Sequence, residues 1–331
     1  MKKLHIFCLY IIINITSFTT EAYPLSEGFL IKNNADKAII PFRYIDDFIV
    51  LPVRLNHGKT LNIILDTGIR SIVIFNKKTA YKHGLFEDRE VIFSGAGLKN
   101  SVEGFVTNQV IVSLPQVQAK GISIVTLNKA FTQLNNMGID GAMGYQIFSR
   151  FIVEIDYKNQ FLVLHNDKKF KLEPGFEKVP ISIEDTRPYV NARVSDLNGE
   201  EQNLKFMIDT GFNNEMILFK NHKTHPAIRS LKKDRFNQTL GKGLAGTIKG
   251  RLAHNFNFCL QNILIKADEV FLPNNNVYEL DDYRDGTIGN KTLSQNLVII
   301  DYINEYLYIR PHYYRKSLDT ILASFAENNW F

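Results

Sequence analysis

The chain has 331 residues, of which 45% are hydrophobic and 22% are charged. These proportions exclude a disordered or fibrous protein, and because a single domain usually has roughly 100–200 residues, the length predicts two domains or lobes. The formal net charge of +5 is spread along the sequence without a basic cluster, so we expect no nucleic-acid partner.

The N-terminus has the pattern of a secretory signal peptide over residues 1–22. Lys2 and Lys3 precede a nearly continuous apolar run over residues 4–15, and Thr20-Glu21-Ala22 offers a small-x-small cleavage site. The apolar run is shorter than the about 20 residues of a membrane-spanning helix. We therefore expect an exported protein, periplasmic or secreted, with no membrane association beyond this segment. An uncleaved N-terminal anchor is the alternative.

Cysteine usage limits the sources of stability. Cleavage after residue 22 leaves only Cys259, so no intramolecular disulfide is expected, and export without disulfides favours a bacterial envelope. The eight histidines are dispersed and no Cys/His set has metal-ligand spacing. We expect neither a metal nor a cofactor.

Three blocks of the sequence occur twice, in the same order. They are residues 61–75 and 204–219, residues 95–104 and 241–250, and residues 140–165 and 285–310. The offsets between the copies are 143, 146 and 145 residues. A series with nearly constant spacing predicts two copies of one unit of roughly 130 residues. The expected organisation is an N-terminal extension (23–41), a first lobe (42–170), a second lobe (171–312) and a helical tail (313–331).

Both copies are rich in short β-strand patterns. Runs of Val and Ile bounded by Gly, Asn or Asp predict strands in the first copy at residues 49–55, 61–65, 71–75, 110–114 and 151–156. The corresponding runs of the second copy lie at residues 189–194, 204–208, 216–219 and 297–302. Helical patterns are confined to one turn at residues 79–83 and a C-terminal helix at 315–325. We therefore expect an all-β protein built of barrels or sandwiches.

Each copy contains Asp-Thr-Gly directly after an apolar run, at Asp66 and at Asp209. A single triplet of this kind is usually a turn, because Asp and Thr bond nearby backbone and Gly adopts positive φ. Here each Asp ends a buried strand, where an ionised carboxylate is costly without compensation. Two carboxylates that face each other and share one proton remove that cost.

This arrangement resembles the aspartic peptidases of the pepsin and retropepsin type, most closely bacterial retropepsin-like enzymes with two lobes in one chain. The resemblance extends over about residues 42–311 and includes an apolar-Gly element later in each lobe, at residues 142–144 and 287–289. It implies the bilobal acid-protease fold, with two pseudo-symmetric barrel-like lobes and a cleft between them. It also implies a monomer that acts on peptide or protein substrates.

The resemblance further implies the mechanism. Asp66 and Asp209 hold a water molecule, one as the general base and the other protonated, without a covalent intermediate. Thr67 and Thr210 bond across to the opposing loop, and Gly68 and Gly211 let backbone amides approach the carboxylates. In the family, a hydroxyl three positions after the glycine of the triplet normally bonds the carboxylate. Ser71 supplies one in the first copy, whereas Asn214 stands there in the second.

A glycine-rich block between the motifs resembles the hairpin flap of the same family. The flap residues that we expect are Gly95, Gly97, Leu98, Gly241, Gly243 and Leu244. Such lids exclude water from a reaction, and a plain surface hairpin is the alternative. A phosphate-binding loop is disfavoured because no Gly-Lys-Ser/Thr follows.

Both copies depart from the family pattern, and the second copy departs more than the first. Bulky Ile69 and Phe212 occupy a position that is usually small, and Asn214 replaces a hydroxyl. These departures leave open a catalytically weak or inactive pseudo-peptidase that binds extended peptides by strand addition. A ligand-binding β-sandwich is a more distant alternative, because it leaves the paired triplets unexplained.

Overall fold

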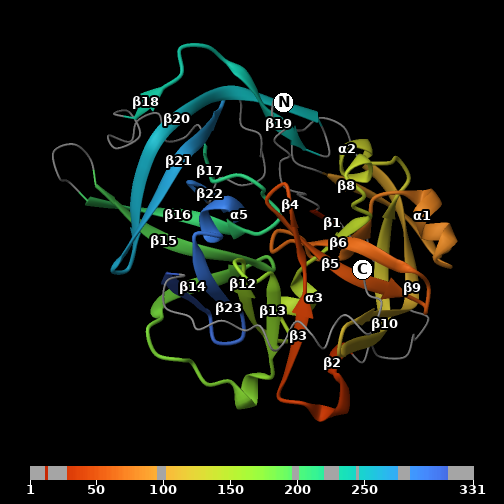
Figure 1. Ribbon diagram of the computed structural model, residues 1–331. Helices are drawn as coiled ribbons and strands as arrows, with labels where there is room; N and C mark the ends of the chain where they lie inside the picture. The colour runs from red at the N-terminus through yellow and green to blue at the C-terminus, as the bar shows by residue number, and fades with distance from the viewer. Residues whose placement is uncertain are drawn as a thin grey trace.

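A computed structural model confirms the all-β, bilobal prediction. The described part of the chain is 59% strand and 10% helix, and it forms two closed six-stranded β-barrels. Figure 1 shows the first barrel in orange and yellow beside the second in green, teal and blue. The structure describes residues 12–13, 28–94, 102–195, 201–219, 231–243, 246–274 and 284–311.

The first barrel is a mixed sheet closed by the pairing of β5 with β9. Its strands, in spatial order, are β9 (Val102–Leu114), β10 (Val117–Leu127), β7 (Ile72–Ile74), β11 (Gly141–Met143), β6 (Thr60–Leu65) and β5 (Phe48–Leu55). Four further strands extend this sheet: β1 (Ile12–Ile13), β2 (Gly28–Ile31), β4 (Arg43–Ile45) and β8 (Arg89–Ser94).

The second barrel repeats this order and closes where β15 pairs with β20. Its strands are β20 (Gly246–Leu260), β21 (Ile263–Pro273), β17 (Met216–Leu218), β22 (Gly286–Gly289), β16 (Glu201–Asp209) and β15 (Arg187–Ser195). Two short strands, β18 (Lys232–Lys233) and β19 (Gln238–Gly243), pair with β20. The strands predicted from the Val- and Ile-rich runs all overlap strands of the two barrels or of the sheet between them.

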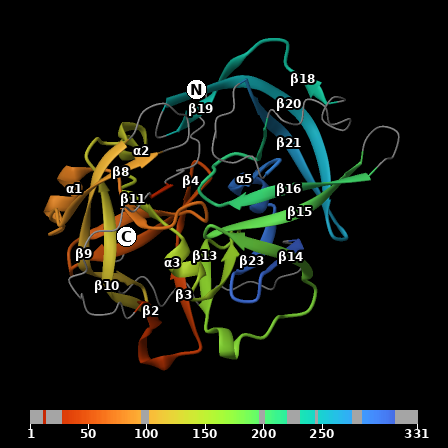
Figure 2. The same cartoon turned by 180° about the vertical axis from the view of Figure 1, so that it is seen from behind.

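A third group of strands joins the two lobes (Figure 2). Its order is β3 (Lys37–Pro41), β13 (Phe161–His165), β12 (Ile152–Asp156), β23 (Asn296–Asp301), β24 (Tyr306–Pro311) and β14 (Glu177–Glu184). In its centre Glu154 pairs with Ile299, the residue 145 positions later and thus its own equivalent in the repeat. A pseudo-twofold axis therefore passes between β12 and β23.

Part of the expected N-terminal extension is built into the first half of the fold. Strand β2 pairs with β10 of the first barrel, and β3 pairs with β13 of the joining sheet. Residues 28–41 therefore contribute strands to the body rather than forming a separate segment.

The helices are short. Helix α1 (Lys77–Lys82) covers most of the predicted turn, and the Asn76 side chain caps it. The others are α2 (Thr132–Asn136), α3 (Tyr145–Phe148), α5 (Asn290–Leu293) and the 3₁₀ turns η1 (Lys32–Asn34) and η2 (Asp167–Lys169). The C-terminal helix predicted at residues 315–325 lies outside the described residues.

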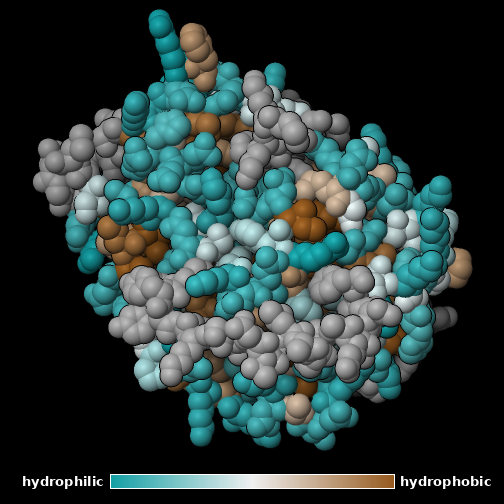
Figure 3. Space-filling view, viewed as in Figure 1, coloured by the Kyte–Doolittle hydropathy of each residue, from teal (hydrophilic) through white to brown (hydrophobic). Residues whose placement is uncertain are grey.

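One large apolar cluster runs through both barrels and the joining sheet, from Phe29 and Ile40 to Val298 and Ile309. On the face shown in Figure 3, hydrophobic residues form small separate patches among hydrophilic ones. The described part of the chain has no helix with the length and hydropathy of a membrane span. The apolar cluster that both barrels share with the joining sheet holds the two lobes together beneath their facing loops.

Candidate active site

The two Asp-Thr-Gly triplets lie at equivalent places in the two barrels. Asp66 follows β6 directly, and Asp209 is the last residue of β16. Each aspartate is 99% buried, with 1% of its surface exposed. Burial at a strand end is the position that the apolar runs before each triplet predict.

Thr67 and Thr210 join the two loops through reciprocal hydrogen bonds. The Thr67 hydroxyl donates to the Ile208 carbonyl (2.7 Å) and accepts from the Thr210 amide (3.0 Å). In the same way, the Thr210 hydroxyl donates to the Leu65 carbonyl (2.8 Å) and accepts from the Thr67 amide (3.1 Å). Both threonines are fully buried. Four bonds across the pseudo-twofold axis therefore fix the position of one triplet relative to the other.

The glycine of each triplet binds the aspartate that precedes it. The Gly68 amide donates to Asp66 Oδ1 (2.7 Å), and the Gly211 amide donates to Asp209 Oδ1 (2.9 Å). A Cβ atom at Gly211 would lie only 2.2 Å from Cγ of Asp66. The Asp66 carboxyl group thus lies against the glycine whose amide holds Asp209. This contact brings the two acids to one place and requires glycine at residue 211.

The apolar-Gly elements support the two loops from below. Strand β11 pairs in parallel with β6 up to Leu65, and strand β22 pairs in parallel with β16 up to Asp209. The Asp66 amide donates to the Met143 carbonyl (2.8 Å), and a Cβ at Gly144 would lie 1.8 Å from the Asp66 carbonyl oxygen. Only a residue without a side chain allows so close an approach.

The strand register shows that the second copy has one extra residue after its triplet. Val73 pairs with Ala142, whereas its equivalent opposite Thr287 is Ile217, 144 positions later instead of 143. Counted back along these strands, the position of Ser71 is occupied by Glu215. Ser71 itself is half-buried before β7.

Asn214, expected beside the carboxylate, belongs to the inserted stretch. Its amide donates to Asn213 Oδ1 (3.2 Å), and its backbone carbonyl accepts from the Lys291 amide (3.2 Å). Among the described contacts, the Asn214 side chain is thus directed to its neighbour and not to Asp209.

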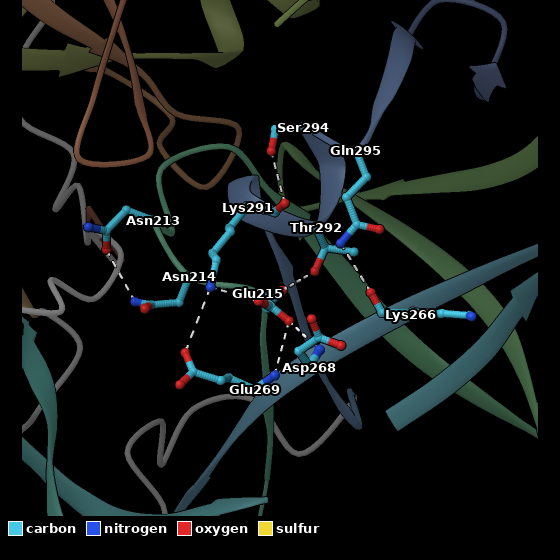
Figure 4. Close-up of polar contacts among 10 residues, drawn as sticks. All are labelled: Asn213, Asn214, Glu215, Lys266, Asp268, Glu269, Lys291, Thr292, Ser294 and Gln295. Atoms are coloured by element: carbon cyan, nitrogen blue, oxygen red, sulfur yellow. Dashed lines mark hydrogen bonds and ion pairs between the residues drawn. The ribbon is translucent and has the colours of Figure 1, made fainter. Parts of the chain in front are cut away.

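Glu215 is the centre of a polar cluster behind the second triplet (Figure 4). Its buried carboxylate forms an ion pair with Lys291 Nζ (2.7 Å) and accepts from the amides of Asp268 and Glu269, the latter at 3.0 Å. Burial opposes the charge of Lys291, but Glu215, with Glu269 and Asp47, more than compensates and raises the lysine pKa. Glu215 therefore connects β17, β21 and α5.

Replacing Glu215 with Gln is expected to lower the free energy of unfolding by about 1–2 kcal/mol. The substitution removes a negative charge to which three groups donate. Lys291 is partly exposed, so solvent weakens the contribution of its ion pair to stability. Glu269→Gln is the matched control, because Glu269 faces the same lysine at 3.7 Å from a more exposed position. We expect a change within about 0.5 kcal/mol there. Equal effects in urea unfolding would contradict the central role of Glu215.

Ile69 and Phe212, the bulky residues after the triplets, are buried in separate apolar clusters. Ile69 belongs to a cluster that contains Ile64, Val73 and Val106, and Phe212 belongs to a cluster that contains Leu240 and Ile248. Each cluster reaches the strands of the glycine-rich hairpin of its lobe, so these side chains link the triplet loop to the hairpin base.

The hairpins themselves are described only in part. Phe93 of β8 pairs with Val102 of β9, and Gly243 of β19 pairs with Gly246 of β20. Gly241 lies in β19 opposite Ile248, after a register shift. The other expected flap residues, Gly95, Gly97, Leu98 and Leu244, lie outside the described residues.

The turn at the start of each lobe contacts the opposite lobe. Asn213 and Asn290 donate to the carbonyls of Asp46 (3.0 Å) and Asp47 (2.7 Å). On the other side, Arg70 pairs with Asp185 (2.7 Å) in the equivalent turn of the second lobe. Polar contacts thus flank the triplets on both sides of the axis.

Two buried residues near the acids carry no signal in the motifs. Arg187, the first residue of β15, donates from Nε to the Gly68 carbonyl (3.3 Å). Burial raises the pKa of Tyr302 far above its usual range; Asp209 and Asp66 add to the rise, and Arg187 opposes it. Arg187 differs in character from its equivalent in the first copy, the apolar Phe48, and this difference is the signal that the sequence contains.

No group of three potential metal ligands (His, Cys, Asp or Glu) occurs within the described ranges. No protein-family model matches the chain, and no curated protein has a matching sequence. The site is therefore defined by its own geometry: two buried carboxyl groups, brought together by two loops that the threonines hold in register.

Proposed function

We propose that this protein is an aspartic endopeptidase that hydrolyses peptide bonds with a water molecule activated between Asp66 and Asp209. The observation that supports the proposal most is the four-bond threonine contact, which brings the two buried carboxyl groups to one place across the pseudo-twofold axis. The Asp66 carboxyl group lies against Gly211, whose amide binds Asp209. Two buried carboxyl groups at one place favour sharing a single proton, since two negative charges would repel each other there.

In this proposal the ionised carboxylate is the general base that takes a proton from water. The protonated carboxyl group donates to the oxygen of the scissile carbonyl. The titration belongs to the pair, so the activity is expected to rise and fall with two apparent pKa values. The backbone amides of Gly68 and Gly211 orient the two carboxyl groups by donating to Oδ1 of Asp66 and of Asp209.

Its substrates are proposed to be extended peptides or unfolded proteins, bound by a monomer between the two lobes. The basic and apolar N-terminal segment favours action after export, in the periplasm or outside the cell.

The test is cleavage of an unstructured protein, such as reduced casein, by the purified protein from acid to neutral pH. We expect a bell-shaped pH dependence and inhibition by a statine-containing peptide, which mimics the tetrahedral intermediate. Absence of cleavage at every pH, together with tight binding of the statine peptide, would instead identify a peptide-binding pseudo-peptidase. Absence of both would reject the proposal.

A further inference from the structure

Arg187 is a buried cation between the two lobes. Its side chain is 5% exposed, and its Nε donates to the carbonyl of Gly68, whose own amide binds Asp66. Asp66, Asp209 and Arg187 all act electrostatically on the buried Tyr302 hydroxyl. The guanidinium therefore shares one poorly solvated region with both acids.

The described acidic partner of Arg187 lies at the surface. Arg187 Nη1 pairs with Asp185 (3.2 Å), whose side chain is 55% exposed and also pairs with Arg70. Solvent screens such an exposed carboxylate strongly. A buried guanidinium interacts more strongly with buried negative charge than with a screened surface carboxylate, because the effective dielectric constant of the interior is lower.

The pseudo-symmetry shows that this cation belongs to one side only. Val50 pairs with Ile64, which lies two residues before Asp66, and Tyr189 pairs with Met207, which lies two residues before Asp209. This register makes Phe48 the equivalent of Arg187, and Phe48 is buried in the apolar cluster that contains Ile64 and Ile69. One lobe thus presents a charge where the other presents a benzyl group.

We propose that Arg187 is a positioning residue that supplies the counter-charge of the Asp66–Asp209 pair and keeps that pair singly ionised in acidic solution. The inference rests on the proposed function for its catalytic meaning. One shared proton leaves the pair with a single negative charge, which matches the single charge of the guanidinium. A nearby cation favours each ionised form, so it lowers both apparent pKa values of the pair.

Other charged and titratable groups also face this region. Arg70 and Asp185 lie at its surface, on the first triplet loop and on the turn before β15, and they pair with each other. Tyr145 on α3 and Tyr302 between β23 and β24 lie within electrostatic range of each other, and burial favours the neutral form of Tyr302. Arg187 is therefore the buried permanent cation among these groups.

The test compares Arg187→Gln and Arg187→Lys. Gln keeps an N–H donor and loses the charge, whereas Lys keeps the charge. In protein labelled with ¹³C at the aspartate carboxyl carbon, Asp66→Asn and Asp209→Asn assign the two signals. We expect Arg187→Gln to move both titration midpoints upward by about one pH unit. The pH profile of cleavage is expected to move with them, and Arg187→Lys to restore the wild-type midpoints.

Arg70→Met is the matched control, since Arg70 pairs with the same Asp185 from an exposed position. Its midpoints are expected to stay at the wild-type values. If Arg187→Gln does not fold, Arg187→Met provides the neutral side chain. Unchanged midpoints in a folded neutral variant, or equal shifts in the Gln and Lys variants, would overturn the inference. Shifted midpoints in a protein that cleaves nothing would reject only the proposed function.

Discussion

Asparagine in place of Asp66 or Asp209 is expected to abolish peptide cleavage, with a fall in kcat/KM of at least about 10³-fold for each variant. Asn is nearly the same size as Asp, and its side-chain oxygen can still accept the hydrogen bond that the backbone amide of Gly68 or Gly211 donates. It can act neither as the base nor as the acid of a shared-proton pair. The measurement is initial rates on an unstructured substrate at the wild-type pH optimum.

Asp156→Asn is the control for this pair of variants. Asp156 is also 1% exposed, and it holds a turn by accepting from the Asn159 amide (2.9 Å) and side chain (2.9 Å). Its repeat equivalent, Asp301, does the same for Asn304. This second repeat-related pair of buried acids is structural, so Asp156→Asn is expected to retain cleavage in its folded form. Cleavage that survives either triplet substitution would reject a two-carboxylate mechanism.

The sequence contains enough information to locate the acids because their position is encoded twice. The ordered repeat predicts that the two triplets lie at equivalent places, and the apolar runs before them predict buried strand ends. The observed pairing of Glu154 with its own equivalent, Ile299, follows from the same duplication. Symmetry thus carries much of the information that a single lobe lacks.

The surroundings of the acids could not be read in the same way. The extra residue before β17 is invisible in an ungapped comparison, because Asn213, Asn214 and Glu215 are all polar and only strand pairing assigns their positions. Arg187 reaches Gly68 from another lobe, 119 residues away in the sequence. Such contacts depend on how two barrels dock, which local periodicity does not describe. The same holds for β3, whose counterpart β14 is identified by strand pairing: Pro41 lies opposite Phe161, and Pro180 lies opposite Tyr306, 145 positions later.

Replacing Thr67 with Val is expected to lower the free energy of unfolding by about 2–4 kcal/mol. The side chains have nearly the same shape, but Val leaves the Ile208 carbonyl without its donor and the Thr210 amide without its acceptor. Each buried polar group deprived of its partner costs about 1–3 kcal/mol. Thr210→Val is expected to have a similar effect, because it removes the bonds to Leu65 and Thr67.

The matched control is Thr67→Ser, which keeps the hydroxyl and removes one methyl group. We expect it to cost about 1 kcal/mol and to retain most of the cleavage rate. Thr67 and Thr210 bond each other in one network, so the loss in the double Val variant is expected to differ from the sum of the two single losses by about 0.5–3 kcal/mol. This variant should also lose cleavage at lower urea concentrations than those that remove its secondary structure, since these bonds set the position of one carboxyl group relative to the other. Urea unfolding followed by circular dichroism, with cleavage rates measured below the transition, separates the two effects. Equal stability of the Val and Ser variants would show that the lobes are held in register by their shared core alone, without the threonines.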